Sequence, residues 1–100
     1  MSRYLIVTAD EFDASHADAL PDWRRDGAWL RADLIAPGFT AAADLARGIA
    51  VIADELDHHP DIDIRYPGRV LVSTTTHDTG GLTMHDVRLA HLVSALHNPT

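Results

Sequence analysis

Three histidines at two places in the chain are the side chains best suited to chemistry. His58 and His59 stand directly before Pro60, and His77 lies farther along in the segment 75–78. An imidazole exchanges its proton near neutral pH, so paired imidazoles can serve as general acid and general base in one reaction. His77 is remote in sequence from His58 and His59, and only folding can bring the three rings to one cavity. The pattern therefore predicts proton-transfer chemistry, provided that the three rings meet.

Metal binding and purely structural roles are the alternatives. Asp54 and His58 are four residues apart, which on a helix places both on one face, a spacing found in metal sites. However, no His-Glu-x-x-His motif occurs. A histidine pair before a proline also serves as a solvated helix end, and His77 could stabilise a loop. The other histidines are expected on the surface: His16, His85, His91 and His97.

The composition predicts a single domain over residues 1–100. With 46% hydrophobic residues, a chain of this length can bury one core. It has no cysteine, which excludes disulfides, cysteine-ligated metals and a thiol nucleophile. The net charge of −7 opposes direct binding to nucleic acid and anionic membranes. No apolar run approaches the roughly twenty residues of a membrane span and no signal-like segment is evident, so we expect a cytoplasmic protein.

An amphipathic helix and a hairpin must position the histidines. The helix is expected from Thr40, its N-cap, to about Asp57, because apolar residues repeat there at intervals of four, three and four. Pro60 stops it, so the histidine pair lies at its end. Alternating residues over 62–66 and 70–75, with a turn between them, predict a β-hairpin after which His77 follows.

Two capping boxes mark the first and last helices. Thr8 with Glu11 and Thr83 with Asp86 have the spacing in which a threonine and a carboxylate satisfy the first amides of a helix. The first helix is expected to break near Pro21, and residues 28–35 form either one strand or a hairpin. The order helix, strand, helix, hairpin, helix predicts an α+β fold in which helices cover one face of an antiparallel sheet.

A set of motifs spreads over much of the chain: Asp54-Glu55-Leu56-Asp57-His58-His59-Pro60, Tyr66, Thr75-Thr76-His77-Asp78, Gly80-Gly81-Leu82-Thr83 and Asp86. Together these motifs resemble the signature of the pterin-4a-carbinolamine dehydratase family, over nearly the whole chain. This resemblance implies an antiparallel four-stranded sheet with three helices packed on one face, and a homodimer or homotetramer.

The resemblance implies a lyase that removes water from a 4a-hydroxytetrahydropterin to give quinonoid dihydropterin, in support of a pterin-dependent hydroxylase. Neither a metal nor an organic cofactor is implied. Catalysis would fall to His58, His59 and His77, with acid and base roles left open among them. The expected substrate-binding residues are Asp54, Asp57, Thr76 and Asp86. The alternative is a non-enzymatic partner protein of the same fold, either a dimerisation cofactor of a transcription factor or a Rubisco assembly chaperone.

The chain departs from the family pattern at a few positions. Ile62 stands where many relatives carry tryptophan, and Leu34 and Ile35 replace aromatic residues. His85 precedes Asp86 where some relatives have arginine. None of these changes removes a candidate acid or base.

Overall fold

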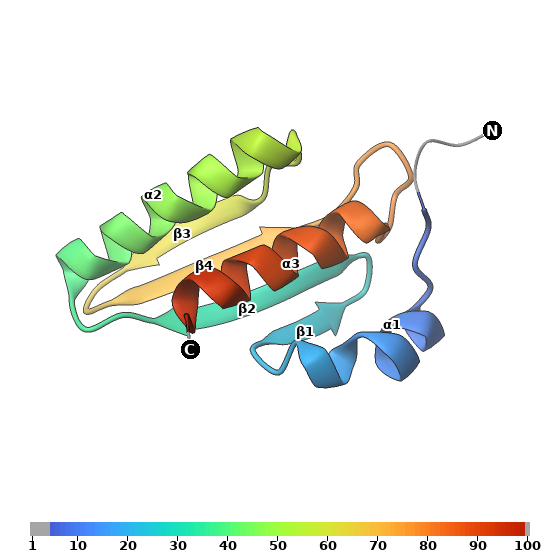
Figure 1. The fold of residues 1–100 in the computed structure, drawn as a ribbon, viewed down its shortest axis with the longest axis horizontal. Coiled ribbons are helices and arrows are strands. Elements are labelled where there is room, and N and C mark those ends of the chain that lie inside the picture. Colours follow the sequence, from blue (N-terminus) through green and yellow to red (C-terminus); the bar gives the residue numbers. More distant parts are fainter. Residues whose placement is uncertain (1–4, 100) are drawn as a thin grey trace.

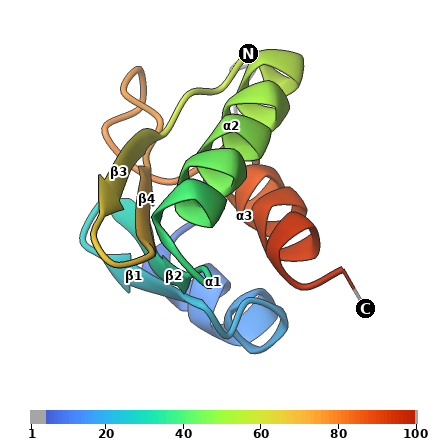
Figure 2. The same ribbon diagram turned by 90° about the vertical axis from the view of Figure 1, so that its left-hand side faces the viewer.

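Four antiparallel strands and three α-helices make up the computed structural model, which describes residues 5–99. The strands are β1 (Trp23–Asp26), β2 (Trp29–Ile35), β3 (Asp61–Arg65) and β4 (Arg69–Thr74). The helices are α1 (Ala9–Ser15), α2 (Phe39–Leu56) and α3 (Met84–His97), with a short 3-10 helix, η1 (Ala17–Ala19), after the first. The sheet has the order β1-β2-β4-β3, and the helices lie on one of its faces (Figure 1, Figure 2). The predicted α+β class and element order are confirmed.

The segment 28–35, left open between one strand and a hairpin, is one strand, β2, and it forms a hairpin with the preceding strand β1, which the sequence did not predict. β1 pairs with β2 in antiparallel register across the turn at Gly27, whose φ of 61° suits glycine. The indole Nε1–H of Trp23 donates to the hydroxyl of Ser94 at 2.9 Å, which ties the first strand to α3.

The helix that precedes the histidine pair starts earlier than predicted. Gly38 is the N-cap, and its carbonyl accepts the amide of Ala42 at 2.9 Å. The predicted N-cap, Thr40, therefore lies inside the first turn, and that prediction is wrong. Gly38 has no side chain, so no side-chain hydrogen bond caps the first amides of this helix.

The two capping boxes form as predicted. Thr8 and Glu11 open α1, and Thr83 and Asp86 open α3. The first helix ends at Ser15, and the 3-10 turn follows it, so the expected break comes before Pro21.

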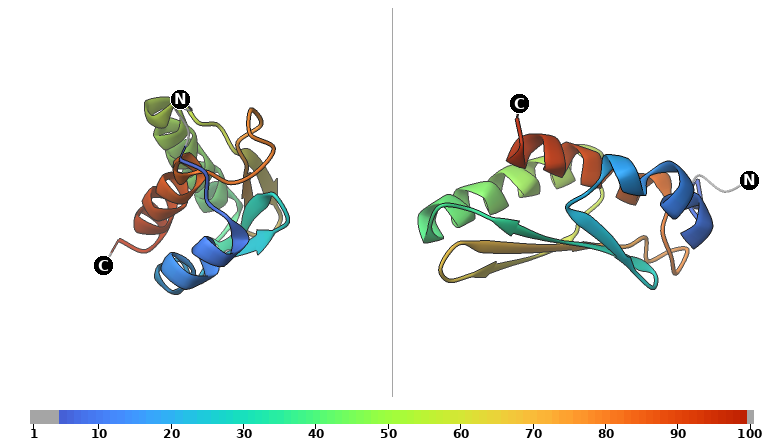
Figure 3. Two further views of the ribbon diagram at one scale, coloured as in Figure 1. Left: turned by 90° about the vertical axis from the view of Figure 1, so that its right-hand side faces the viewer. Right: turned by 90° about the horizontal axis from the view of Figure 1, so that it is seen from below.

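The core lies between the sheet and the helices. Alternate side chains of β2 and β4 point inward, and the outward face carries Arg31, Asp33, Arg69 and Ser73 together with the apolar Trp29, Ile35 and Leu71. Seen from below, the helices lie together on the opposite side from that outward face (Figure 3). Among residues 5–99, none of the helices is both long and apolar enough to cross a membrane. Central core residues are Leu30, Ala32, Leu34, Val70, Val72, Ala42, Ala46, Ile49, Val87, Ala90 and Val93.

A fully buried carboxylate, that of Asp86, joins the ends of several elements. It accepts hydrogen bonds from the hydroxyls of Thr74 at 2.6 Å and Thr76 at 2.7 Å, and from the amide of Thr83 at 3.0 Å. His58, just beyond α2, adds a contact of 2.6 Å from Nε2. Burial is the largest effect on the pKa of Asp86 and raises it, but the hydrogen bonds together outweigh burial and hold that pKa below its ordinary value.

The Asp86→Asn substitution is expected to destabilise the protein by about 2–4 kcal/mol at pH 7, because the amide nitrogen cannot accept these bonds. A lowered carboxyl pKa stabilises the fold above the unfolded value of about 3.9, and this contribution disappears as the pH falls through the folded value. The difference between wild type and variant should therefore shrink below about pH 4. Guanidinium unfolding at several pH values measures it.

The control for this experiment is Asp13→Asn, which changes an exposed carboxylate on α1. It should alter the free energy of unfolding by less than about 0.5 kcal/mol at every pH. A difference between wild type and Asp86→Asn that stays constant down to pH 2 would contradict the assigned ionisation.

Candidate active site

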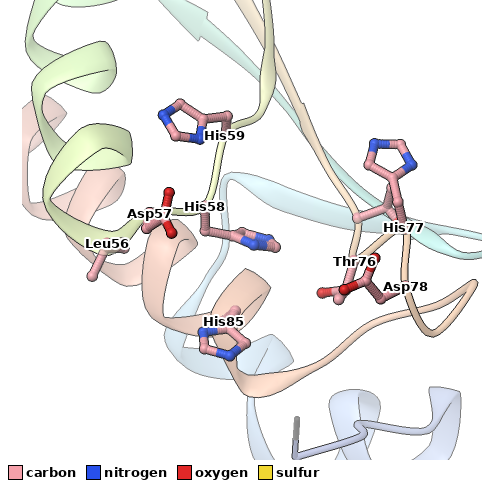
Figure 4. A pocket seen from close by; sticks show the side chains of 9 residues that line it. Leu56, Asp57, His58, His59, Thr76, His77, Asp78 and His85 are labelled. Atoms are coloured by element: carbon pink, nitrogen blue, oxygen red, sulfur yellow. The ribbon is translucent and has the colours of Figure 1, made fainter. Parts of the chain in front are cut away.

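The end of α2 sends His58 and His59 in different directions. Asp57 adopts a left-handed conformation with φ of 52°, which aspartate tolerates better than most residues. The amide of His58 then donates to the carbonyl of Ala53 at 3.1 Å and closes the helix. Figure 4 shows the His58 ring directed toward the loop that carries His77, whereas the His59 ring points away from that loop.

His58 is held by the buried carboxylate. Its Nε2 lies 2.6 Å from Oδ1 of Asp86, and its side chain is 12% exposed. An ionised carboxylate can only accept hydrogen bonds, so Nε2 must carry a proton. The other ring nitrogen, Nδ1, is therefore the atom of His58 that can take up or release a proton.

A chain of hydroxyls fixes the other oxygen of Asp86. The hydroxyl of Thr76 donates to Oδ2 of Asp86 and lies 2.8 Å from the hydroxyl of Thr83. Since each hydroxyl has one hydrogen, Thr83 must donate to Thr76. The oxygen of Thr83 in turn accepts the amide of His85 at 3.2 Å. The direction of every hydrogen in this chain follows from the charge on Asp86.

His59 is held at the surface by a different carboxylate. Its Nε2 lies 2.9 Å from Oδ1 of Asp54, and the two side chains are 58% and 79% exposed. The pairing of Asp54 with His58 that would favour a metal site is therefore not formed, because the helix ends before residue 58. Within the described residues, no three His, Asp or Glu side chains form a group that could hold a metal ion.

His77 lies in the loop between β4 and α3, as predicted from its place after the hairpin. The loop is closed by a bond of 3.2 Å from the amide of Thr76 to the carbonyl of Gly81. The imidazole is exposed and meets the ring of Trp29 edge-on, with 6.0 Å between centroids and 81° between planes.

A cavity of about 530 Å³ brings the three predicted histidines together. That volume lies within the range of small-molecule sites. Thr76 and Asp57 also line it, whereas Asp54 and Asp86 do not, and each of these two carboxylates instead bonds an imidazole that does. The lining residues are Leu56, Asp57, His58, His59, Thr75, Thr76, His77, Asp78 and His85.

His85 lines the cavity, and its assignment to the surface is wrong. It is half-buried and stacks on His58, with 5.6 Å between ring centroids and 26° between planes. The physical reason is the capping box, which brings the first turn of α3 against the end of α2 through Asp86. The position of His85 next to Asp86 was the only sequence signal for this contact.

Comparison with known proteins places these features in a family. The family model described as pterin 4 alpha carbinolamine dehydratase matches residues 6–96. A Mycobacterium tuberculosis (strain ATCC 25618 / H37Rv) protein named "Putative pterin-4-alpha-carbinolamine dehydratase" is 40% identical over 91% of this chain and 95% of its own length. A protein of the same name from Nocardia farcinica (strain IFM 10152) is 40% identical, covering 90% of this chain and 94% of that protein.

A solved structure shows the same fold. The crystal structure of the transcriptional coactivator/pterin dehydratase from Brucella melitensis has a TM-score of 0.82 and 26% sequence identity, covering 91% of this chain and 97% of that one. The matched residues 6–96 include every residue that lines the cavity. The chain therefore belongs to the pterin 4 alpha carbinolamine dehydratase family.

Proposed function

We propose that this protein dehydrates a 4a-hydroxytetrahydropterin to quinonoid dihydropterin and water. The observation that carries the proposal is the meeting of three imidazoles in one cavity, with one of them held by a buried, ionised carboxylate. Family membership supports a pterin as the substrate class. Homo-oligomerisation and a partner hydroxylase remain predictions of the family resemblance, and a cytoplasmic location remains a prediction from the composition.

The proposed reaction requires only proton transfers from the protein. The C4a–oxygen bond breaks, and the leaving oxygen takes a proton from a general acid and departs as water. The lone pair of the adjacent ring nitrogen drives this step, and a general base removes a ring N–H proton. Each proton transfer by a positioned group typically contributes about 10²- to 10⁴-fold to the rate. No electron is gained or lost, so imidazoles suffice.

The surroundings of each ring suggest a division of roles. Asp86 stabilises the positive charge that His58 acquires when Nδ1 takes a proton, which supports His58 as the base. His59 and His77 are exposed, so either can be reprotonated from solvent and supply the proton for the leaving oxygen. The carboxylate of Asp57 can accept N–H groups of the pterin. The hydroxyl hydrogen of Thr76 is engaged by Asp86, so toward a substrate this oxygen acts as an acceptor.

The His58→Ala substitution is expected to lower kcat about 10²- to 10⁴-fold, because it removes the proposed base. Stopped-flow absorbance on enzymatically generated 4a-hydroxytetrahydropterin measures the rate. His91→Ala, which changes an exposed histidine on α3, is the matched control and should equal wild type. The proposal fails if wild type is no faster than buffer, or if the triple alanine variant of His58, His59 and His77 matches wild type.

The two carboxylates that hold imidazoles should differ in their effects. Asp54→Asn breaks an exposed pair, and such pairs contribute little, so we expect less than about a threefold loss of kcat. Asp86→Asn removes the charge behind His58, and we expect a loss of about a hundredfold in protein that is still folded. The same assay, run with circular dichroism as a check of folding, compares them. Equal losses would show that burial of the carboxylate does not decide its role.

A partner-binding role is the second candidate, because the structural relative from Brucella melitensis is described as both a coactivator and a dehydratase. If binding replaces catalysis, a stoichiometric partner should be captured from native cells by the wild type and by the triple alanine variant alike. The wild type should then show no dehydration. Rapid dehydration without any captured partner would rule this candidate out.

A further inference from the structure

We propose that Trp29 is a positioning residue that fixes the imidazole of His77 at the mouth of the cavity. The inference rests on the proposed function for its kinetic readout, and on geometry alone for its spectroscopic one. Trp29 starts β2, on the face of the sheet that points away from the core. It is absent from the residues that line the cavity, so we expect it to act on a substrate through His77, the lining residue whose ring it contacts.

The first step of the argument is that His77 lacks the support that its partners have. His58 is bound to Asp86, and His59 to Asp54. Across residues 5–99, no hydrogen bond reaches the ring of His77, and its ring contact is the edge-on one with Trp29. A perpendicular arrangement at this separation is a favoured geometry for aromatic rings. The indole therefore orients the ring of His77, as a carboxylate orients the rings of His58 and His59.

The second step is that the loop backbone is already fixed near His77. The hydroxyl of Thr75 donates to the carbonyl of Ala28 at 2.5 Å, which fastens the start of the loop to the β1–β2 turn. The amide of Thr76 bonds Gly81 across the loop. With the backbone tied on both sides, the orientation of the His77 ring depends mainly on its side-chain torsions. Contact with Trp29 selects among them.

The third step is that Trp29 is itself held in place. The guanidinium of Arg31 lies 5.1 Å from the centroid of a Trp29 ring, in reach of a cation–π interaction. That guanidinium is anchored by Asp26 at 2.8 Å and by the hydroxyl of Ser73 at 2.8 Å. The support of His77 thus extends through Trp29 and Arg31 onto the outer face of the sheet.

A double-mutant cycle tests whether Trp29 acts through His77. Trp29→Leu should lower kcat about tenfold, because small displacements of a reacting group are costly. In the His77→Ala background the same change should have no further effect, since the group that it positions is gone. Trp29→Phe should recover most of the activity by restoring a ring. Multiplicative losses in the double variant, or Trp29→Phe as slow as Trp29→Leu, would overturn the proposal.

Leu71→Ala is the matched control, because Leu71 lies on the same outer face of the sheet and is also half-buried, on the neighbouring strand. Its kcat should equal that of wild type. Losses as large as those of Trp29→Leu would show that any truncation on this face disturbs the site, which would defeat a specific role for Trp29.

The imidazole signals of His77 in ¹H–¹³C spectra give a readout that needs no activity. They are assigned by their loss in His77→Ala. The ring current of Trp29 should displace them, and Trp29→Leu should move them toward the position of a free imidazole, while Trp29→Phe moves them less. Unchanged His77 signals in Trp29→Leu would overturn the contact. If wild type itself fails to dehydrate the pterin, the proposed function falls, and these spectra still decide the positioning role.

Discussion

The charge on Asp86 is the constraint on which the site depends. A carboxylate without solvent contact is costly unless donors surround it, and its donors come from the end of β4, the following loop, the start of α3 and the end of α2. Each donor must stay in place for the charge to remain stable. Satisfying one buried charge therefore also sets the distance between the histidine-bearing end of α2 and the loop that carries His77.

The three predicted histidines are oriented by different means, and the difference matches their exposure. His58 is shielded and bound to a buried anion, whereas His59 shares a hydrogen bond with Asp54 at the exposed surface. His77 is oriented by an aromatic contact. This difference in exposure suits a reaction in which one shielded group holds a positive charge and an exposed group exchanges protons with water.

Local sequence patterns predicted the features that depend on residues close together in the chain, such as the end of α2 and the two capping boxes. The repeat in α2 and the stop at Pro60 predicted that His58 and His59 follow the end of this helix, and the capping box predicted that Asp86 lies in the first turn of α3. The expected pairing of Asp54 with His58 did not form, because the four-residue spacing places side chains together only while a helix continues, and α2 ends at Leu56. The contacts of His85 and Trp29 join residues far apart in the chain. The periodicity of the sequence does not predict such contacts, because they form only when separate elements pack together.

The left-handed turn at Asp57 has a consequence for how the chain can vary in length. One residue added to or removed from α2 would rotate the following pair by about 100° around the helix axis. His58 would then lose its contact with the carboxylate of Asp86, and the cavity would lose its half-buried imidazole. The turn between β3 and β4 lies at the surface, where insertions are tolerated. Natural insertions and deletions should therefore accumulate at that turn and be absent from the twenty or so positions that lead up to Asp57.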